Sequence, residues 1–146
     1  MKICREVRDL LEKRQKQLTV LTDARIRFSA VKQSFLTLRE DWDDEGAAGY
    51  KKETLDRAWR FWREISARAF KSVETYFPPP VFRPGPRGSV DIRWITEEYE
   101  LLLNIPEDSR QKITFYGEHR QKSSLRGSVS DGEDSELLIV WLNSPW

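Results

Sequence analysis

The segment from Phe77 to Gly88, FPPPVFRPGPRG, contains five of the seven prolines in the chain. Proline has no backbone N–H and fixes φ at about −65°, so this segment cannot form the interior of a helix. We predict an extended, polyproline-like connector, because the alternative, a recognition peptide, would need a partner with a groove. The segment therefore separates a helical first half from a second half with strand patterns.

The first 40 residues contain no glycine and no proline. Their apolar residues recur mostly at spacings of three, four or seven, which is the period of an amphipathic helix. Either one long helix or a pair is allowed, because Asp23 is a good N-cap for a second helix. The apolar positions are Ile3, Val7, Leu10, Leu11, Leu18, Leu21, Phe28, Val31, Phe35 and Leu38.

Charged residues flank this narrow apolar stripe, and residues 1–30 hold eight basic and four acidic side chains. Such a pattern indicates a coiled coil or a helix that binds in a partner's groove, although the stripe could equally pack on the rest of the chain. We interpret residues 1–34 as a helical extension for partner binding or homo-oligomerisation, and 35–146 as a compact domain. The candidate partner-binding residues are Val7, Leu10, Leu11, Arg14, Leu18, Leu21, Asp43, Asp44 and Glu45.

A second helix is predicted from about Lys52 to Tyr76, with one apolar face that includes Leu55, Trp62 and Ile65. The opposite face is basic. It is expected to face solvent, and a nucleic-acid site is the alternative. The residues of that alternative site are Arg57, Arg60, Arg63 and Arg68.

Alternating apolar and polar residues predict strands at 89–95, 99–105 and 112–116, joined as an antiparallel meander. The polar segment 117–136 is expected to be a mobile loop. Residues 134–143 fit either a strand or a short helix, and propensity favours the strand. The predicted fold is α+β: a long N-terminal helix or helix pair, and a second helix packed on a small antiparallel sheet of three or four strands.

The composition argues against several chemistries. The single cysteine, Cys4, and the single histidine, His119, are too far apart in the chain for a Cys/His metal cluster. No glycine-rich phosphate loop is present, so no cofactor or metal is expected, and His119 is interpreted as a surface residue. A net charge of only +1 gives no bulk signal for nucleic-acid binding. No signal peptide or membrane span is apparent, so we expect a cytoplasmic protein that does not bind membranes.

Four carboxylates surround Trp42, at Asp41, Asp43, Asp44 and Glu45. They are the basis of an alternative hypothesis, a metal-dependent nuclease or toxin. The spacing lacks the alternation of an EF-hand loop, and no other acid is placed to complete a metal site. We interpret the segment as a structural corner with solvated acids, which would face a basic partner surface if they bind anything.

Two groups of residues form short patterns: Asp41, Trp42, Asp43, Glu45, Gly46 and Ala47, followed by Pro84, Gly88, Val90, Ile92 and Trp94. These patterns resemble small bacterial proteins that carry an "NWDGxGAxP" box followed by a "GxIxxEW" strand. The chain departs from this pattern where Asp44 replaces a glycine and Arg93 replaces an acid. The resemblance implies a helix at 134–143 and an antitoxin-like or phage-defence accessory role. The striped basic N-terminal helix, and the absence of a nucleophile, metal cluster or phosphate loop from the sequence, predict a non-enzymatic protein-interaction module, of which this role is the most concrete form.

Overall fold

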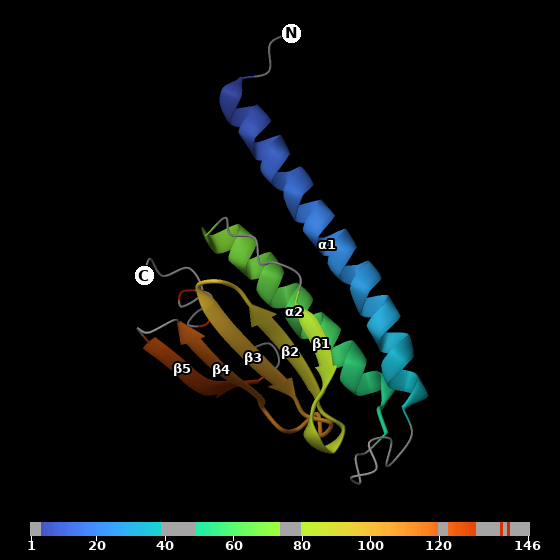
Figure 1. Cartoon of the computed structure of the whole chain (residues 1–146). Helices are drawn as coiled ribbons and strands as arrows, with labels where there is room; N and C mark the ends of the chain where they lie inside the picture. Colours follow the sequence, from blue (N-terminus) through green and yellow to red (C-terminus); the bar gives the residue numbers. More distant parts are fainter. Residues whose placement is uncertain are drawn as a thin grey trace.

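The computed structural model describes residues 4–38, 49–73, 80–119, 123–130, 138 and 140. These residues form two helices and a five-stranded antiparallel sheet, so the fold is α+β, as the sequence predicts. Both helices lie on the same side of the sheet (Figure 1). The opposite face of the sheet is covered by neither of them.

The first helix, α1, runs without a break from Arg5 to Thr37 and is about 50 Å long at 1.5 Å per residue. Of the two arrangements that the sequence allows, the single helix is the correct one. Thr22 does not begin a new helix, because its hydroxyl donates to the carbonyl of Leu18 one turn earlier. Only three residues of α1 are fully buried, namely Ala24, Phe28 and Phe35.

The second helix, α2 (Lys52–Val73), packs its apolar face on strands β2 (Val90–Ile95) and β3 (Tyr99–Ile105). Its central residue is Trp62, the largest side chain that is fully buried. Trp59 stacks on Trp62 and on Phe28 of α1, with ring centroids 5.3 and 5.0 Å apart. These aromatic contacts join the two helices above the sheet.

The sheet is a simple meander in which each strand pairs with its neighbours along the chain. Side chains alternate between the face toward the helices, which is buried, and the outer face, which is partly or fully exposed. The strands are β1 (Val81–Pro84), β2 (Val90–Ile95), β3 (Tyr99–Ile105), β4 (Ile113–His119) and β5 (Ser123–Val129).

The polar segment after residue 117 was wrongly predicted to be a mobile loop, because it contains the end of β4 and the whole of β5. Gly127 of β5 lies opposite Phe115 of β4. A Cβ at Gly127 would come within 2.8 Å of the Phe115 ring, so the glycine allows that ring to lie directly over the strand. The sheet therefore has five strands rather than three or four.

His119 was also placed wrongly, since it is only 3% exposed rather than on the surface. It ends β4 on the buried face, directly opposite Tyr99 of β3, and the two ring centroids lie 5.8 Å apart. Burial raises the pKa of the Tyr99 hydroxyl above its usual value.

The proline-rich segment is more than a connector. Residues 81–84 form β1, an edge strand that contacts α1, and residues 86–88 form the 3₁₀ turn η1. Proline is tolerated at an edge, where no ladder hydrogen bond is lost. In the ambiguous segment 134–143, the two described residues, Leu138 and Val140, are helical, and Leu138 belongs to the core.

One ion pair across the helices gives a prediction about pH. Lys32 Nζ of α1 lies 2.7 Å from Asp56 Oδ1 of α2 and holds the pKa of Asp56 below 3.8. Because the pKa is lower in the folded state, this stabilisation is complete at neutral pH and is lost as the pH falls below about 4. Replacing Lys32 with glutamine should raise the Asp56 pKa toward 3.8, measured by NMR titration of the carboxyl carbons.

Replacing Lys112 with glutamine is a suitable control. Lys112 is exposed, lies directly before β4 in the chain and does not contact Asp56. An Asp56 pKa that stays the same in Lys32→Gln and wild type would show that the ion pair does not form in solution.

Candidate functional site

The N-terminal half of α1 extends past the end of α2 and past the sheet (Figure 1). Four large apolar side chains on this part are exposed by about half or more: Val7 by 47%, Leu10 by 63%, Leu11 by 53% and Leu18 by 55%. We call these four residues the overhang stripe. They are among the residues that the sequence nominates for partner binding.

The other two residues of α1 that the sequence nominates, Arg14 and Leu21, differ in their exposure to solvent. Leu21 is partly buried and packs against the core, where it joins the buried face of α1. Arg14 is exposed beside the overhang stripe. The apolar side of α1 therefore changes from core contact to solvent exposure between Ala24 and Leu18.

The acidic residues Asp41, Asp43, Asp44 and Glu45 lie outside the described residues, so the metal hypothesis for them stays a prediction. Within the described ranges, no three His, Cys, Asp or Glu side chains are grouped closely enough to hold a metal ion.

The sequence predicts that Arg57 lies on a solvent-facing side of α2, and this prediction is wrong. The Arg57 side chain is buried, with an exposed fraction of 5%. Its guanidinium donates hydrogen bonds to three backbone carbonyls of the β3–β4 turn: Pro106 at 3.3 Å, Asp108 at 3.5 Å and Gln111 at 2.8 Å. Arg57 therefore fixes the turn to α2 and is not available to contact nucleic acid.

The other three candidates for nucleic-acid contact, Arg60, Arg63 and Arg68, are exposed on α2. α1 carries eight basic and four acidic residues, and α2 carries six basic and three acidic residues. The two helices together therefore have an excess of seven positive charges. Since the whole chain has a net charge of +1, the remainder is acidic. The helices thus form a basic layer of the molecule.

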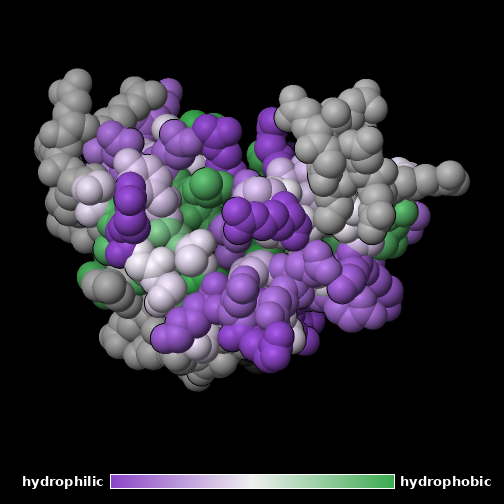
Figure 2. Space-filling view, turned by 90° about the horizontal axis from the view of Figure 1, so that it is seen from below, coloured by the Kyte–Doolittle hydropathy of each residue, from purple (hydrophilic) through white to green (hydrophobic). Residues whose placement is uncertain are grey.

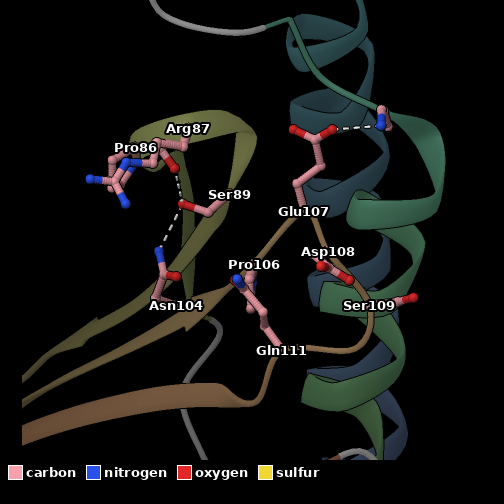
Figure 3. A pocket seen from close by; sticks show the side chains of 10 residues that line it. Pro86, Arg87, Ser89, Asn104, Pro106, Glu107, Asp108, Ser109 and Gln111 are labelled. Carbon is pink, nitrogen blue, oxygen red and sulfur yellow. Dashed lines mark hydrogen bonds and ion pairs between the residues drawn. The ribbon is translucent and has the colours of Figure 1, made fainter.

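A polar cavity of about 620 Å³ lies at one end of the sheet. Three segments form its walls: the residue before α2, the η1 turn between β1 and β2, and the β3–β4 turn (Figure 3). Seen from below, this end of the molecule is largely hydrophilic (Figure 2). The polar side chains used below are those of Lys51, Arg87, Ser89, Asn104, Glu107 and Gln111.

The η1 turn has an unusual backbone. Arg87 has φ 56° and ψ 41°, the left-handed conformation, and is the only non-glycine residue with positive φ in the described ranges. For a residue with a Cβ, this conformation costs about 1–2 kcal/mol. Gly88 follows with φ 74°, and a Cβ there would lie 2.3 Å from Glu107 Oε2. Glycine suits this position because an L side chain is strained at this φ, and a Cβ would also displace the carboxylate of Glu107.

Hydrogen bonds hold the cavity walls in place. Ser89, which is 4% exposed, donates from its hydroxyl to the Pro86 carbonyl at 2.6 Å. Asn104 Nδ2 donates to Ser89 Oγ and to Asp91 Oδ1, each at 2.8 Å. On the opposite wall, Lys51 Nζ lies 2.6 Å from Glu107 Oε1. Side-chain contacts therefore connect residues within each wall of the cavity.

The sequence is not similar to a known group in any comparison. No family model matches the chain, and no curated protein or solved structure matches it significantly. Neither described helix is long and apolar enough to cross a membrane. The function has to be argued from the surface of this chain alone.

Sequence reasoning found the overhang stripe but missed the cavity. The only signals were two turn motifs, Pro-Gly-Pro-Arg-Gly at 84–88 and Pro-Glu-Asp-Ser at 106–109. Each predicts a turn. Neither shows that the two turns, about 20 residues apart in the chain, meet at the same end of a sheet.

Proposed function

We propose that the protein is a cytosolic, non-enzymatic protein-binding module that contacts its partner through the overhang stripe. The observation that supports this is the exposure of Val7, Leu10, Leu11 and Leu18 on a helix that extends past the rest of the chain. Apolar residues grouped on a projecting helix are typical of helix-in-groove and coiled-coil recognition.

The energetics are consistent with a specific contact. Completing the burial of a half-exposed leucine contributes about 1 kcal/mol, so four such side chains provide roughly 4 kcal/mol before flanking charges are counted. Arg14 lies beside the stripe and can pair with an acidic group on a partner. The resemblance to the small bacterial proteins described above makes an antitoxin-like or defence-system accessory role the most concrete form of this proposal.

The test is a double substitution, Leu10→Gln with Leu18→Gln, in the full-length tagged protein. Both side chains are exposed in the free chain, so thermal stability should change little, by about 0.5 kcal/mol or less for each substitution. Binding of co-purifying proteins should fall at least about tenfold, since two apolar contacts are replaced by polar groups. Quantitative mass spectrometry of the purified complexes measures this change.

A matched control is Ile26→Gln with Leu36→Gln. These residues are also exposed apolar positions of α1, at 65% and 41%, but they lie in the half of the helix that runs beside the rest of the chain. Partners that survive the first double substitution, or that are lost equally in the control, would refute the proposal. A second copy of the chain as partner would be recognised by a shift in sedimentation from dimer to monomer.

Nucleic-acid binding is the second candidate, favoured by the excess of seven positive charges on the helices. Its site would be formed by Arg60, Arg63 and Arg68 without the buried Arg57. A gel shift that weakens steeply with salt and with replacement of these three arginines by glutamine would support it, because phosphate contacts release counterions.

A further inference from the structure

We propose that the cavity between η1 and the β3–β4 turn binds the oxyanion group, phosphate or carboxylate, of a small polar ligand, with Arg87 as its principal contact. This site is separate from the overhang stripe. It therefore stands whether or not α1 binds a partner.

Arg87 brings a positive charge to the cavity. Its side chain lines the cavity and is exposed, and it makes no ion pair or hydrogen bond with any residue that the structure describes. The two acids of the cavity are already engaged. Glu107 pairs with Lys51, and Asp108 accepts hydrogen bonds from Arg110, which hold the Asp108 pKa at about 2. Within the described residues, the guanidinium of Arg87 is thus a cation of this polar cavity that pairs with no carboxylate.

The backbone of Arg87 is held in the left-handed conformation. A left-handed conformation suits glycine or asparagine, so an arginine here is unfavourable for the turn itself. The conformation is imposed by its surroundings: Gly85 N donates to Ser89 O at 2.8 Å, and Ser89 N donates to Pro86 O at 3.1 Å. Strained residues held in this way are concentrated at binding sites.

The cavity is lined by side chains that can donate hydrogen bonds. The two prolines of this turn carry no N–H, and the N–H groups of Gly85 and Ser89 already donate to carbonyls within the turn, so side chains supply most of the donors for an anion. The side chain of Gln111 rises between the two walls (Figure 3). Lys51 keeps donor capacity beyond its bond to Glu107, because an ammonium group has three N–H bonds. Together with Arg87, these side chains give donors from three segments, and a guanidinium matches phosphate and carboxylate geometry well.

The experiment uses the full chain labelled with ¹⁵N and titrated at constant ionic strength with inorganic phosphate in one series and N-acetylglycine in another. The amide signals of Gly88, Ser89 and Gln111 should shift and saturate with at least one of the two ligands. Arg87→Asn should weaken this binding about tenfold or more, because one charge-assisted contact is removed.

Asparagine accepts the left-handed conformation, so Arg87→Asn is expected to remain folded, which its own NMR spectrum will show. Arg83→Gln is the matched control, since it removes the same charge from an exposed arginine of β1 that does not line the cavity. Saturation by phosphate alone identifies a phosphate site, and saturation by N-acetylglycine alone identifies a carboxylate site. No saturation with either ligand, or equal weakening by both variants, overturns the proposal.

Discussion

Replacing Arg57 with alanine is expected to lower the free energy of unfolding by about 2–4 kcal/mol, since three carbonyls of the β3–β4 turn would lose a charged donor inside the protein. The shortest of these bonds, 2.8 Å to Gln111, joins α2 to the start of β4. Urea denaturation of the full-length chain, followed by tryptophan fluorescence, measures the change.

The control for this prediction is Arg63→Ala on the same helix. Arg63 is exposed, so its loss should change stability by no more than about 0.5 kcal/mol. Equal stability of the two variants would mean that the turn does not depend on Arg57. Arg57→Lys should recover only part of the loss, because an ammonium cannot reach three carbonyls in the planar arrangement of a guanidinium.

Trp62→Ala is expected to have the largest effect of any single core substitution, a loss of about 3–5 kcal/mol. Trp62 is completely buried between α2 and the sheet, and Trp59 stacks on it. Removing the indole would leave a cavity beneath α2 and would take away the aromatic contact that continues to Phe28. Thermal unfolding followed by circular dichroism measures this loss.

Trp62→Phe separates the volume of the side chain from its polar atom. The indole Nε1 is buried and has no hydrogen-bond partner within the described part of the chain. Phenylalanine removes this unsatisfied N–H while retaining most of the apolar surface, so its cost should be about 1 kcal/mol. If both variants lost equally large amounts of stability, the indole N–H would have to contribute to folding, contrary to the structure.

The elements with a strong apolar period were predictable from the sequence. α1 and α2 follow from helical spacing, and β2 and β3 follow from alternation of residues such as Val90, Ile92 and Trp94. β5 was not predictable, because its serines and glycine have low strand propensity. β5 is stabilised instead by its hydrogen-bonded pairing with β4 and by the packing of the Phe115 ring over Gly127.

The basic face of α2 illustrates a different limit. Helical spacing puts Arg57 on the side away from Trp62, and an arginine is normally exposed. The β3–β4 turn comes from a segment about 50 residues later and supplies the carbonyls that bury it. Sequence spacing within one helix cannot show such a partner. The same limit explains why His119 was mistaken for a surface residue.

The two candidate sites also differ in how far the sequence predicts them. The overhang stripe lies on one helix, so its residues could be named from their spacing. Only the structure shows that Leu21 is partly buried against the core while Leu18 is exposed. The cavity is built from three distant segments, and its key feature, the backbone of Arg87, has no signal in residue type. Acids 41–45, the most prominent sequence feature, lie outside the described residues.

The contact between α1 and β1 has a consequence for synthesis on the ribosome. Phe28 of α1 packs on Phe82 of β1, with ring centroids 5.1 Å apart, yet Phe82 is translated 54 residues later. At a translation rate of about 5–20 residues per second, Phe82 is synthesised roughly 3–10 s after Phe28. During that interval the core-facing residues of α1 and its overhang stripe are both exposed, so the nascent helix presents a longer apolar surface than the finished protein. A partner or chaperone that binds α1 would therefore meet its strongest target before the sheet has formed.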